Sequence, residues 1–190
     1  MKKKLIILIA ILTSNFIEAQ FIKEKSINAQ IGYGISLPYD SVDETADDGF
    51  FMQGELVLEA YSWLEIRPYA GLILVNSNGK DIDGNPTNEK AESKAFLIGG
   101  KTRLRAPIRW VAPYIEAGIG ISAGKFETFT AFTNINKSGV IYHIPVSFGL
   151  ELGKKNNFDL GFTYFFHPTV EQYSGAFTLG VTIPLKDKQK

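Results

Sequence analysis

The chain contains two histidines, His143 and His167, which are the residues most able to act as a general base near neutral pH. His167 is followed at short distance by Glu171 and Ser174. A serine nucleophile needs a base within hydrogen-bond reach and a group that orients this base, so the trio has the residue types for acyl hydrolysis. His143 lies in an alternating stretch, where a hydrogen-bonded interior histidine is the preferred interpretation. We keep the trio as a catalytic alternative and assign no catalytic residue.

A second candidate for chemistry is the acidic segment 81–92. Its oxygen-bearing side chains stand at positions 1, 3, 5, 9 and 12 of a calcium-loop register: Asp81, Asp83, Asn85, Glu89 and Glu92. Position 6, where the sharp turn of such a loop needs glycine, is Pro86, and no helices flank the segment. We therefore expect a solvated loop, no bound cofactor and no metal site, although Asp81, Asp83, Asn85 and Glu92 are the candidate ligands.

The composition excludes several classes of protein. The 190 residues include no cysteine, which excludes disulfides, cysteine-ligated metals and the lipid-bearing cysteine of a lipoprotein. The 20 basic and 20 acidic residues give a formal net charge of zero, and no basic patch is present, so we expect no nucleic-acid partner. Segment 38–50 carries acidic residues without a basic neighbour, and these predict an acidic rim: Asp40, Asp43, Glu44, Asp47 and Asp48.

The first 19 residues have the pattern of a secretory signal peptide. Three lysines at residues 2–4 precede an unbroken apolar run at residues 5–12, and Ala19 is a small residue suited to cleavage. The apolar run is too short to span a bilayer, and no later run reaches the length of a membrane-spanning helix. We therefore expect residues 1–19 to be removed, which leaves one domain at residues 20–190.

The mature chain is a succession of segments in which apolar and polar residues alternate. Alternation with period two is typical of β-strands, and it occurs in eight segments: 26–38, 51–61, 64–75, 95–105, 111–122, 140–152, 158–166 and 175–185. The connections between them alternate between long and short. Long loops at one end and short turns at the other are typical of transmembrane barrels, so the sequence predicts an all-β, eight-stranded antiparallel up-and-down transmembrane β-barrel.

The two faces of these strands differ in a way that decides which face is inside. One face carries large apolar residues, and aromatic residues collect near the strand ends, as expected of a surface that meets lipid. The other face carries glycines and charges of both signs, which suit the narrow interior of an eight-stranded barrel. The alternative is a soluble lipocalin-like barrel, which binds a ligand inside and has its faces reversed.

The interior charges predict a filled lumen rather than a pore. Glu55, Arg67 and Arg103, together with Tyr69 and Tyr114, are expected to plug it. We expect Arg67 to lie between Glu59 on one neighbouring strand and Arg103 or Arg105 on the other. Buried charge is costly unless it is paired, so acidic residues must neutralise these cations: Glu59, Glu65, and Asp159 or Glu151 from across the lumen.

With these strands, the signal peptide ending EAQ and the last strand ending TIPL, the chain resembles the small outer-membrane barrels of the OmpA/OmpX type. More narrowly, it resembles the porin-family "outer membrane protein beta-barrel" proteins of Bacteroidota. The resemblance implies a Gram-negative outer-membrane location but no single activity. Lipid A deacylase barrels place a histidine, a serine and an acid at the outer end. Their motif of a histidine, then a serine two residues later, then an asparagine is absent at His167. Many small outer-membrane barrels also end on an aromatic residue, whereas the last strand here ends at Leu185.

The resulting hypothesis is a non-enzymatic outer-membrane barrel with a structural or surface-interaction role and four extracellular loops. Its expected partners are outer-membrane lipid, lipopolysaccharide bridged by cations at the acidic rim, and an extracellular ligand at the loops, with the protein itself a monomer. Two alternatives come from other classes. One is a lipid A acyl hydrolase, and the other is a soluble lipocalin-like ligand-binding barrel.

Overall fold

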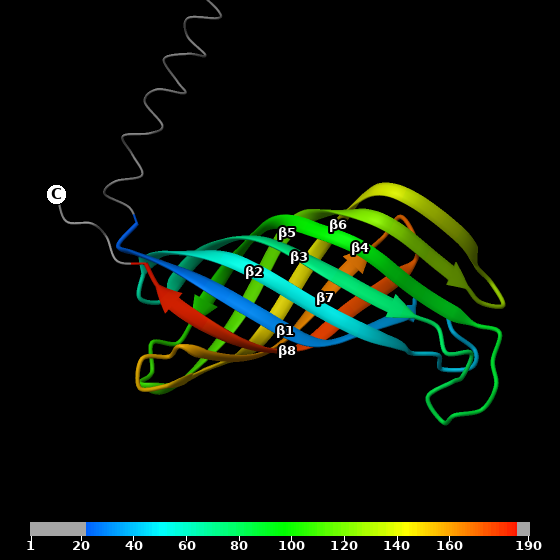
Figure 1. The fold of residues 1–190 in the computed structure, drawn as a ribbon, viewed down its shortest axis with the longest axis horizontal. Coiled ribbons are helices and arrows are strands. Elements are labelled where there is room, and N and C mark those ends of the chain that lie inside the picture. The colour runs from blue at the N-terminus through cyan, green and yellow to red at the C-terminus, as the bar shows by residue number, and fades with distance from the viewer. Residues whose placement is uncertain (1–21, 186–190) are drawn as a thin grey trace, which may run out of the picture.

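The computed structural model describes residues 22–185, which form a closed antiparallel barrel (Figure 1). Its eight strands are β1 (Glu24–Pro38), β2 (Asp47–Tyr61), β3 (Leu64–Asn76), β4 (Lys90–Arg105), β5 (Trp110–Phe129), β6 (Asn134–Gly153), β7 (Phe158–His167) and β8 (Gln172–Pro184). Each strand pairs with the next in the chain, and β1 pairs with β8 to close the barrel. The predicted architecture is therefore confirmed, whereas the predicted signal peptide lies outside the described residues.

The short turns and the start of β1 lie at one end of the barrel, which we call the turn end (Figure 1). The opposite end, the loop end, carries the connections at residues 39–46, 77–89, 130–133 and 168–171. Within residues 22–185, no helix has the length and apolar composition needed to cross a membrane.

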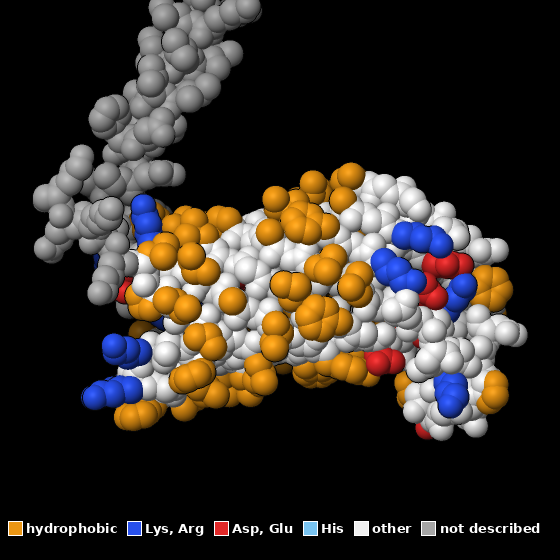
Figure 2. Space-filling view, viewed as in Figure 1, with side chains coloured by type: hydrophobic (Ala, Val, Ile, Leu, Met, Phe, Trp, Pro, Cys, Tyr) orange, Lys and Arg blue, Asp and Glu red, His pale blue; other side chains and the backbone are white. Residues whose placement is uncertain are grey.

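The outer surface carries the large apolar side chains, and the charges lie inside or at the two ends (Figure 2). Ile119 is 68% exposed on the outer face of β5, and Leu179 is 65% exposed on that of β8. Neighbouring positions turn inward and are buried, as for Glu116 and Thr178. The predicted assignment of faces is confirmed, and it gives the barrel an apolar belt that water would solvate poorly.

Several strands extend further toward the loop end than the sequence pattern predicts. Residues 123–139, expected to be a long loop, are mostly strand, because β5 runs to Phe129 and β6 begins at Asn134. The outward positions beyond the apolar belt are charged, which made this part of the sequence look like a loop. In the structure these charges pair across strands, since Lys90 Nζ lies 2.7 Å from Glu127 Oε1, and such pairs stabilise a sheet.

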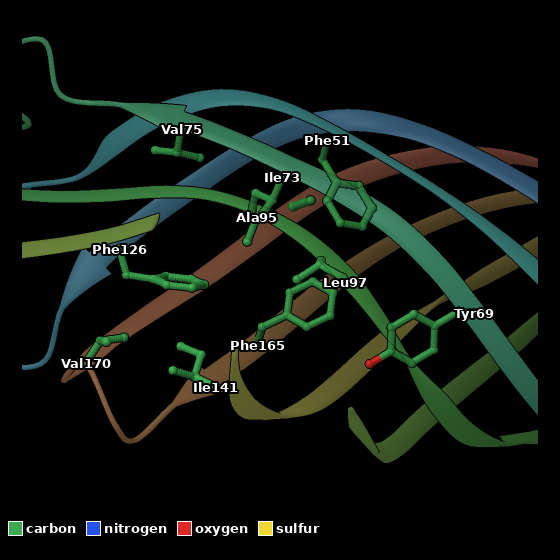
Figure 3. Close-up of a cluster of buried hydrophobic side chains, with 11 residues drawn as sticks. Phe51, Tyr69, Ile73, Val75, Ala95, Leu97, Phe126, Ile141, Phe165 and Val170 are labelled. Carbon is green, nitrogen blue, oxygen red and sulfur yellow. The ribbon is translucent and has the colours of Figure 1, made fainter. Parts of the chain in front are cut away.

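The barrel interior has an apolar half that the sequence analysis did not predict. Toward the loop end, buried side chains from seven strands, β2 to β8, and from the β7–β8 loop form one cluster (Figure 3), which includes Phe51, Ile73, Leu97, Phe126, Phe165 and Val170. The expectation of a polar lumen therefore holds in full only for the half near the turn end, because nearer the loop end the apolar cluster lies beside a smaller set of buried polar side chains, such as Ser36, Ser93 and Ser174. Both faces of β2, β3 and β4 carry apolar residues over this stretch, so alternation alone does not show which side chains turn inward.

A charge on the outer face tests which surface meets lipid. We expect Ile119→Arg to lower the free energy of unfolding in lipid bilayers by about 2–4 kcal/mol, because this side chain faces hydrocarbon in the middle of β5. Phe132→Arg is the control, since Phe132 is 76% exposed in the loop at residues 130–133, and its effect should stay within about 0.5 kcal/mol. Urea unfolding measures both. Unchanged stability of Ile119→Arg would show that this face does not meet hydrocarbon.

Candidate functional site

The half of the interior near the turn end is filled by an ion network. It comprises four basic and six acidic side chains: Arg67, Lys101, Arg103, Arg105, Glu55, Glu59, Glu65, Glu116, Glu151 and Asp159. Most of these side chains are buried, and only Arg105 and Glu59, nearest the turn end, are partly exposed. Alternation along β2 to β7 places them all on the inner face, so that the closed sheet brings residues far apart in sequence into contact.

Arg103 joins three strands across the lumen. Its Nε donates to Glu116 Oε1 at 2.6 Å, and its Nη1 donates to Glu151 Oε1 at 2.5 Å and to Asp159 Oδ2 at 2.9 Å. The guanidinium also lies 3.5 Å from the ring centroid of Tyr114, a cation–π contact. The Tyr114 hydroxyl donates to Asp159 Oδ1 at 2.7 Å. The predicted neutralisation by Glu151 and Asp159 from across the lumen is confirmed.

The predicted partner of Arg67 is wrong. Arg67 Nε donates to Glu55 Oε2 at 2.5 Å and its Nη1 to Glu65 Oε2 at 2.9 Å, whereas Glu59 pairs with Arg105 at 2.7 Å. In the register Glu55 lies opposite Tyr69 and Glu59 opposite Glu65, so Arg67 stands midway between the two glutamates, and Arg105, nearer the turn end, takes Glu59. Lys101 completes the pairing, with Nζ 2.6 Å from both Glu55 Oε1 and Glu116 Oε2.

A chain of hydrogen bonds crosses the barrel between the ion network and the apolar cluster. It links Tyr69 Oη to His143 Nε2, His143 Nδ1 to Ser122 Oγ at 2.6 Å, and Ser122 Oγ to His167 Nε2 at 2.9 Å. Each imidazole nitrogen donates or accepts according to its tautomer, so the tautomers of the two histidines set the direction of all three hydrogen bonds together. The predicted interior, hydrogen-bonded His143 is confirmed, while Ser122 was missed because a small residue in a glycine-rich strand gives no signal.

The structure does not bring the candidate catalytic trio together. His167 and Ser174 are both fully buried inside the barrel, where Ser174 Oγ lies 2.9 Å from Ser36 Oγ and 2.8 Å from Ser93 Oγ. Glu171 instead lies at the exposed loop end, where it accepts a hydrogen bond from Thr133. The grouping inferred from sequence spacing was wrong, because a short loop folds back between β7 and β8 and turns the three side chains to different neighbours.

The four loops at the loop end are tied together by two glutamates. Glu89 ends the 77–89 loop, and it accepts hydrogen bonds from Ser41 Oγ at 2.6 Å, the Val42 amide at 3.0 Å and the Ala131 amide at 3.2 Å. Glu171, in the 168–171 loop, accepts at its carbonyl from the Tyr39 amide at 2.9 Å and at its carboxylate from Thr133 at 2.9 Å. We call this assembly of four loops the cap.

The environment of Glu89 favours its ionised form. Burial alone raises the pKa of this carboxyl, but the hydrogen bonds from Ser41 and from the Asp43, Ala131 and Val42 amides outweigh burial and hold the pKa below its usual value. The carboxylate therefore joins the loops most strongly when it carries a charge, because hydrogen bonds to an ionised acceptor are stronger than those to a neutral one.

The segment with the calcium-loop register uses several of its acidic side chains in other contacts. Asp81 uses its carboxylate to close its own loop, accepting from the amides of Asp83 at 3.0 Å and Asn85 at 2.7 Å. Glu89 turns into the cap, and Glu92 Oε2 accepts from Lys94 at 3.1 Å. The candidate ligands thus point to different partners, and within residues 22–185 no three histidine, aspartate or glutamate side chains are placed to hold a metal ion.

The closed sheet, its apolar outer belt and its charged interior can be compared with known structures. Neisserial surface protein A (NspA) has the same fold, with a TM-score of 0.60 and 12% sequence identity over 85% of this chain and 97% of that chain. The chain has the fold of the small outer-membrane β-barrels. Ail of Yersinia pestis aligns with a TM-score of 0.48 at 15% identity, over 86% of this chain and 100% of Ail. The outer membrane enzyme PagL aligns with a TM-score of 0.46 at 14% sequence identity, over 84% of this chain and 99% of PagL. No protein-family model and no curated protein matches the chain.

The partner of Arg67 can be established by double-mutant cycles in urea unfolding. We expect Arg67→Ala to cost about 3–5 kcal/mol, because it removes a buried cation that pairs with both Glu55 and Glu65. Combining it with Glu55→Ala should cost clearly less than the sum of the two single changes. Glu59→Ala, the matched control, should cost about 0–1 kcal/mol and couple more weakly to Arg67, since its ion pair is partly exposed. Stronger coupling to Glu59 than to Glu55 would contradict the geometry.

Removal of the Glu89 carboxylate should loosen the cap. We expect Glu89→Ala to speed amide hydrogen exchange at Val42, Asp43 and Ala131 by about tenfold, because each loses a charged acceptor. Asp40→Ala, an exposed acid on the same rim, is the control and should change none of these rates.

The amides of Val42, Asp43 and Ala131 also report how the stability of the cap depends on pH. The folded pKa of Glu89 is lowered, so its stabilisation of the cap is fully present above the unfolded value of about 4.3 and is lost as the pH falls through the folded pKa. Protection that increases on acidification would contradict this assignment.

Proposed function

We propose that this protein is a non-enzymatic barrel of the Gram-negative outer membrane that is closed to ions and presents a preformed extracellular surface. The single observation that carries the proposal is the cap, in which all four loops at the loop end are hydrogen-bonded to one another through Glu89 and Glu171. Loops ordered in this way bind a partner at a smaller entropic cost than mobile loops do. The fold it shares with NspA and the apolar belt support the membrane location.

The packing of the interior supports a barrel without a pore. The ion network fills the half near the turn end, and the apolar cluster fills the half near the loop end. An eight-stranded barrel has room for little more than its own side chains. Ions crossing it would have to separate the buried pairs of Arg67 and Arg103, which are among the most costly contacts to break.

The two alternative functions have less support. A lipid A acyl hydrolase needs a serine and a histidine in contact at a surface that lipid reaches, whereas His167 and Ser174 are buried and bonded to other residues. A lipocalin-like barrel would hold an apolar ligand inside and charges outside, which is the reverse of the observed faces.

The proposal extends to the surroundings of the barrel. Its partners would be lipid at the apolar belt, lipopolysaccharide through cations at the acidic rim, and an extracellular ligand at the cap, with the barrel itself monomeric. Aromatic residues of β7, β8 and the first loop gather near the loop end, where Tyr164 and Tyr173 lie 5.1 Å apart and Tyr39 lies 4.2 Å from Tyr173. Such residues suit a membrane–water interface. We assign the chain to the porin family of Bacteroidota on two features, the EAQ end of the predicted signal peptide and the TIPL end of the last strand.

Reconstitution tests the closed barrel and the absence of activity together. Folded protein, verified by its compact migration in unheated SDS gels, should give no conductance steps in planar bilayers, because the interior is filled. Its expression should leave the mass spectrum of lipid A unchanged. Stable conductance steps would contradict the closed interior, and loss of an acyl chain from lipid A would contradict the non-enzymatic role. In that case His167→Ala should restore the acyl chain if His167 is the base.

A further inference from the structure

The outer rim of the barrel at the turn end is positively charged. Figure 2 shows basic side chains at this end, and five of the described ones are exposed: Lys23, Lys25, Arg109, Lys154 and Lys155. Glu24 is also exposed, but it lies opposite Glu59 of the ion network and so belongs to the inner row of β1. The other described acids of this half lie in the ion network. The five cations, which we call the basic rim, therefore have no described carboxylate beside them on the outer face and attract anions.

A shallow groove opens on the outer face beside the basic rim. It has a volume of about 370 Å³, and its apolar walls come from the β2–β3 turn, the β4–β5 turn and the strands that flank them: Trp63, Leu104, Ala106, Pro113 and Ile115. Arg105 and Tyr114 also border the groove, but the Arg105 guanidinium and the Tyr114 hydroxyl donate to carboxylates of the ion network. The groove therefore presents an apolar surface on the side of the barrel that meets lipid.

Two members of the basic rim flank this groove. On one side, Lys23 Nζ lies 5.2 Å from the ring centroid of Tyr61, and this ring stacks on Trp63 with the centroids 5.7 Å apart. On the other side, Arg109 is exposed in the same turn as Ala106, and it forms no ion pair with any described residue. An apolar groove between two cations matches a ligand that has an acyl chain and a phosphate.

The surroundings of the groove favour an anionic lipid as this ligand. Trp63 is 49% exposed and Trp110 is 55% exposed, and tryptophan is typical of the level of the lipid head groups. Lysine and arginine at this level attract anionic lipids. A zwitterionic head group would bring an ammonium group, for which the basic rim has no described carboxylate. Peptidoglycan carries carboxylates too, but it has no acyl chain to occupy the groove.

We propose that the turn end binds an anionic phospholipid of the periplasmic leaflet, with an acyl chain in the groove beside Trp63 and the phosphate between Lys23 and Arg109. The proposal rests on the proposed function, since it requires that the turn end lie at the periplasmic surface of the outer membrane. It adds the class of lipid that the barrel selects there. Binding at this level also holds the barrel at a fixed depth, because the basic rim stays at the head groups.

Tryptophan quenching tests the proposal on the full mature chain, because the sequence has two tryptophans and both lie at the turn end. The protein carries Trp110→Phe, so that Trp63 reports alone. It is folded into phosphatidylcholine vesicles that contain a fixed fraction of either brominated phosphatidylglycerol or brominated phosphatidylcholine. We expect the brominated phosphatidylglycerol to quench Trp63 with a relative binding constant about fivefold higher. Added salt should reduce this preference, because it screens the cations.

Two matched double variants separate the site from the general charge of the basic rim. Lys23→Gln combined with Arg109→Gln should abolish the preference for phosphatidylglycerol. Lys154→Gln combined with Lys155→Gln, the control on the β6–β7 turn, removes the same charge from the same rim and should leave the preference unchanged. Compact migration in unheated SDS gels verifies that each variant is folded.

Several outcomes would overturn the proposal. These are equal quenching by the two brominated lipids, and an equal loss of preference in both double variants. Binding to isolated peptidoglycan that requires Lys23 and Arg109, without a preference between lipids, would assign the basic rim to the cell wall instead. The proposed function is measured separately by conductance and lipid A, so equal quenching would leave it standing. Absence of quenching by either lipid would contradict the membrane location as well.

Discussion

The ion network inside the barrel is the interaction on which the rest of the structure depends. A sheet closed around eight strands has an inner face that must be filled, and here that face is charged over half its length. Buried charges are tolerated only when every one has partners, which Arg103 obtains from three different strands. The glycines of the inner face leave room for this network, since a side chain at Gly149 or Gly161 would meet the Tyr114 hydroxyl beside Asp159. The network thus joins strands across the closed barrel and fills the half of its interior near the turn end.

The apolar cluster and the cap form the half of the structure near the loop end. The cluster excludes water below the barrel mouth, and Val170 inserts into it from the β7–β8 loop, so that the cap is anchored to the core as well as tied by Glu89 and Glu171. The inward turn of this loop leaves the upper edge of β6 unpaired. Val170 thus anchors the cap to the interior, while residues 134–143 of β6 pair only with β5 among the described strands.

Much of the fold could be predicted from the sequence, because the period of two occurs in every strand and the two faces differ over most of the strands. The strand ends could not be predicted, since charged residues such as Lys94 and Lys125 occur in a loop as readily as in a strand that extends beyond the apolar belt. The apolar residues that face inward could not be predicted, because both faces are apolar where Phe51 and Leu97 lie. Within the site, Arg67 stands midway between Glu55 and Glu59 in the register, and the choice of Glu55 depends on Arg105, which pairs with Glu59; such competition between cations cannot be predicted from a single sequence.

The central claim is that one face of each strand meets lipid and the other faces a filled interior. Because the chain has no cysteine, a single spin label can be attached to one cysteine substituted at each position from 111 to 129 of β5 in bilayers. Accessibility to oxygen, which partitions into lipid, should alternate with period two and peak at Ile115, Ile119 and Ile121. At Lys125 and Glu127 a water-soluble nickel reagent should become the more accessible one. Oxygen peaks at Glu116 and Ser122, or nickel access along the whole outward row, would contradict the account.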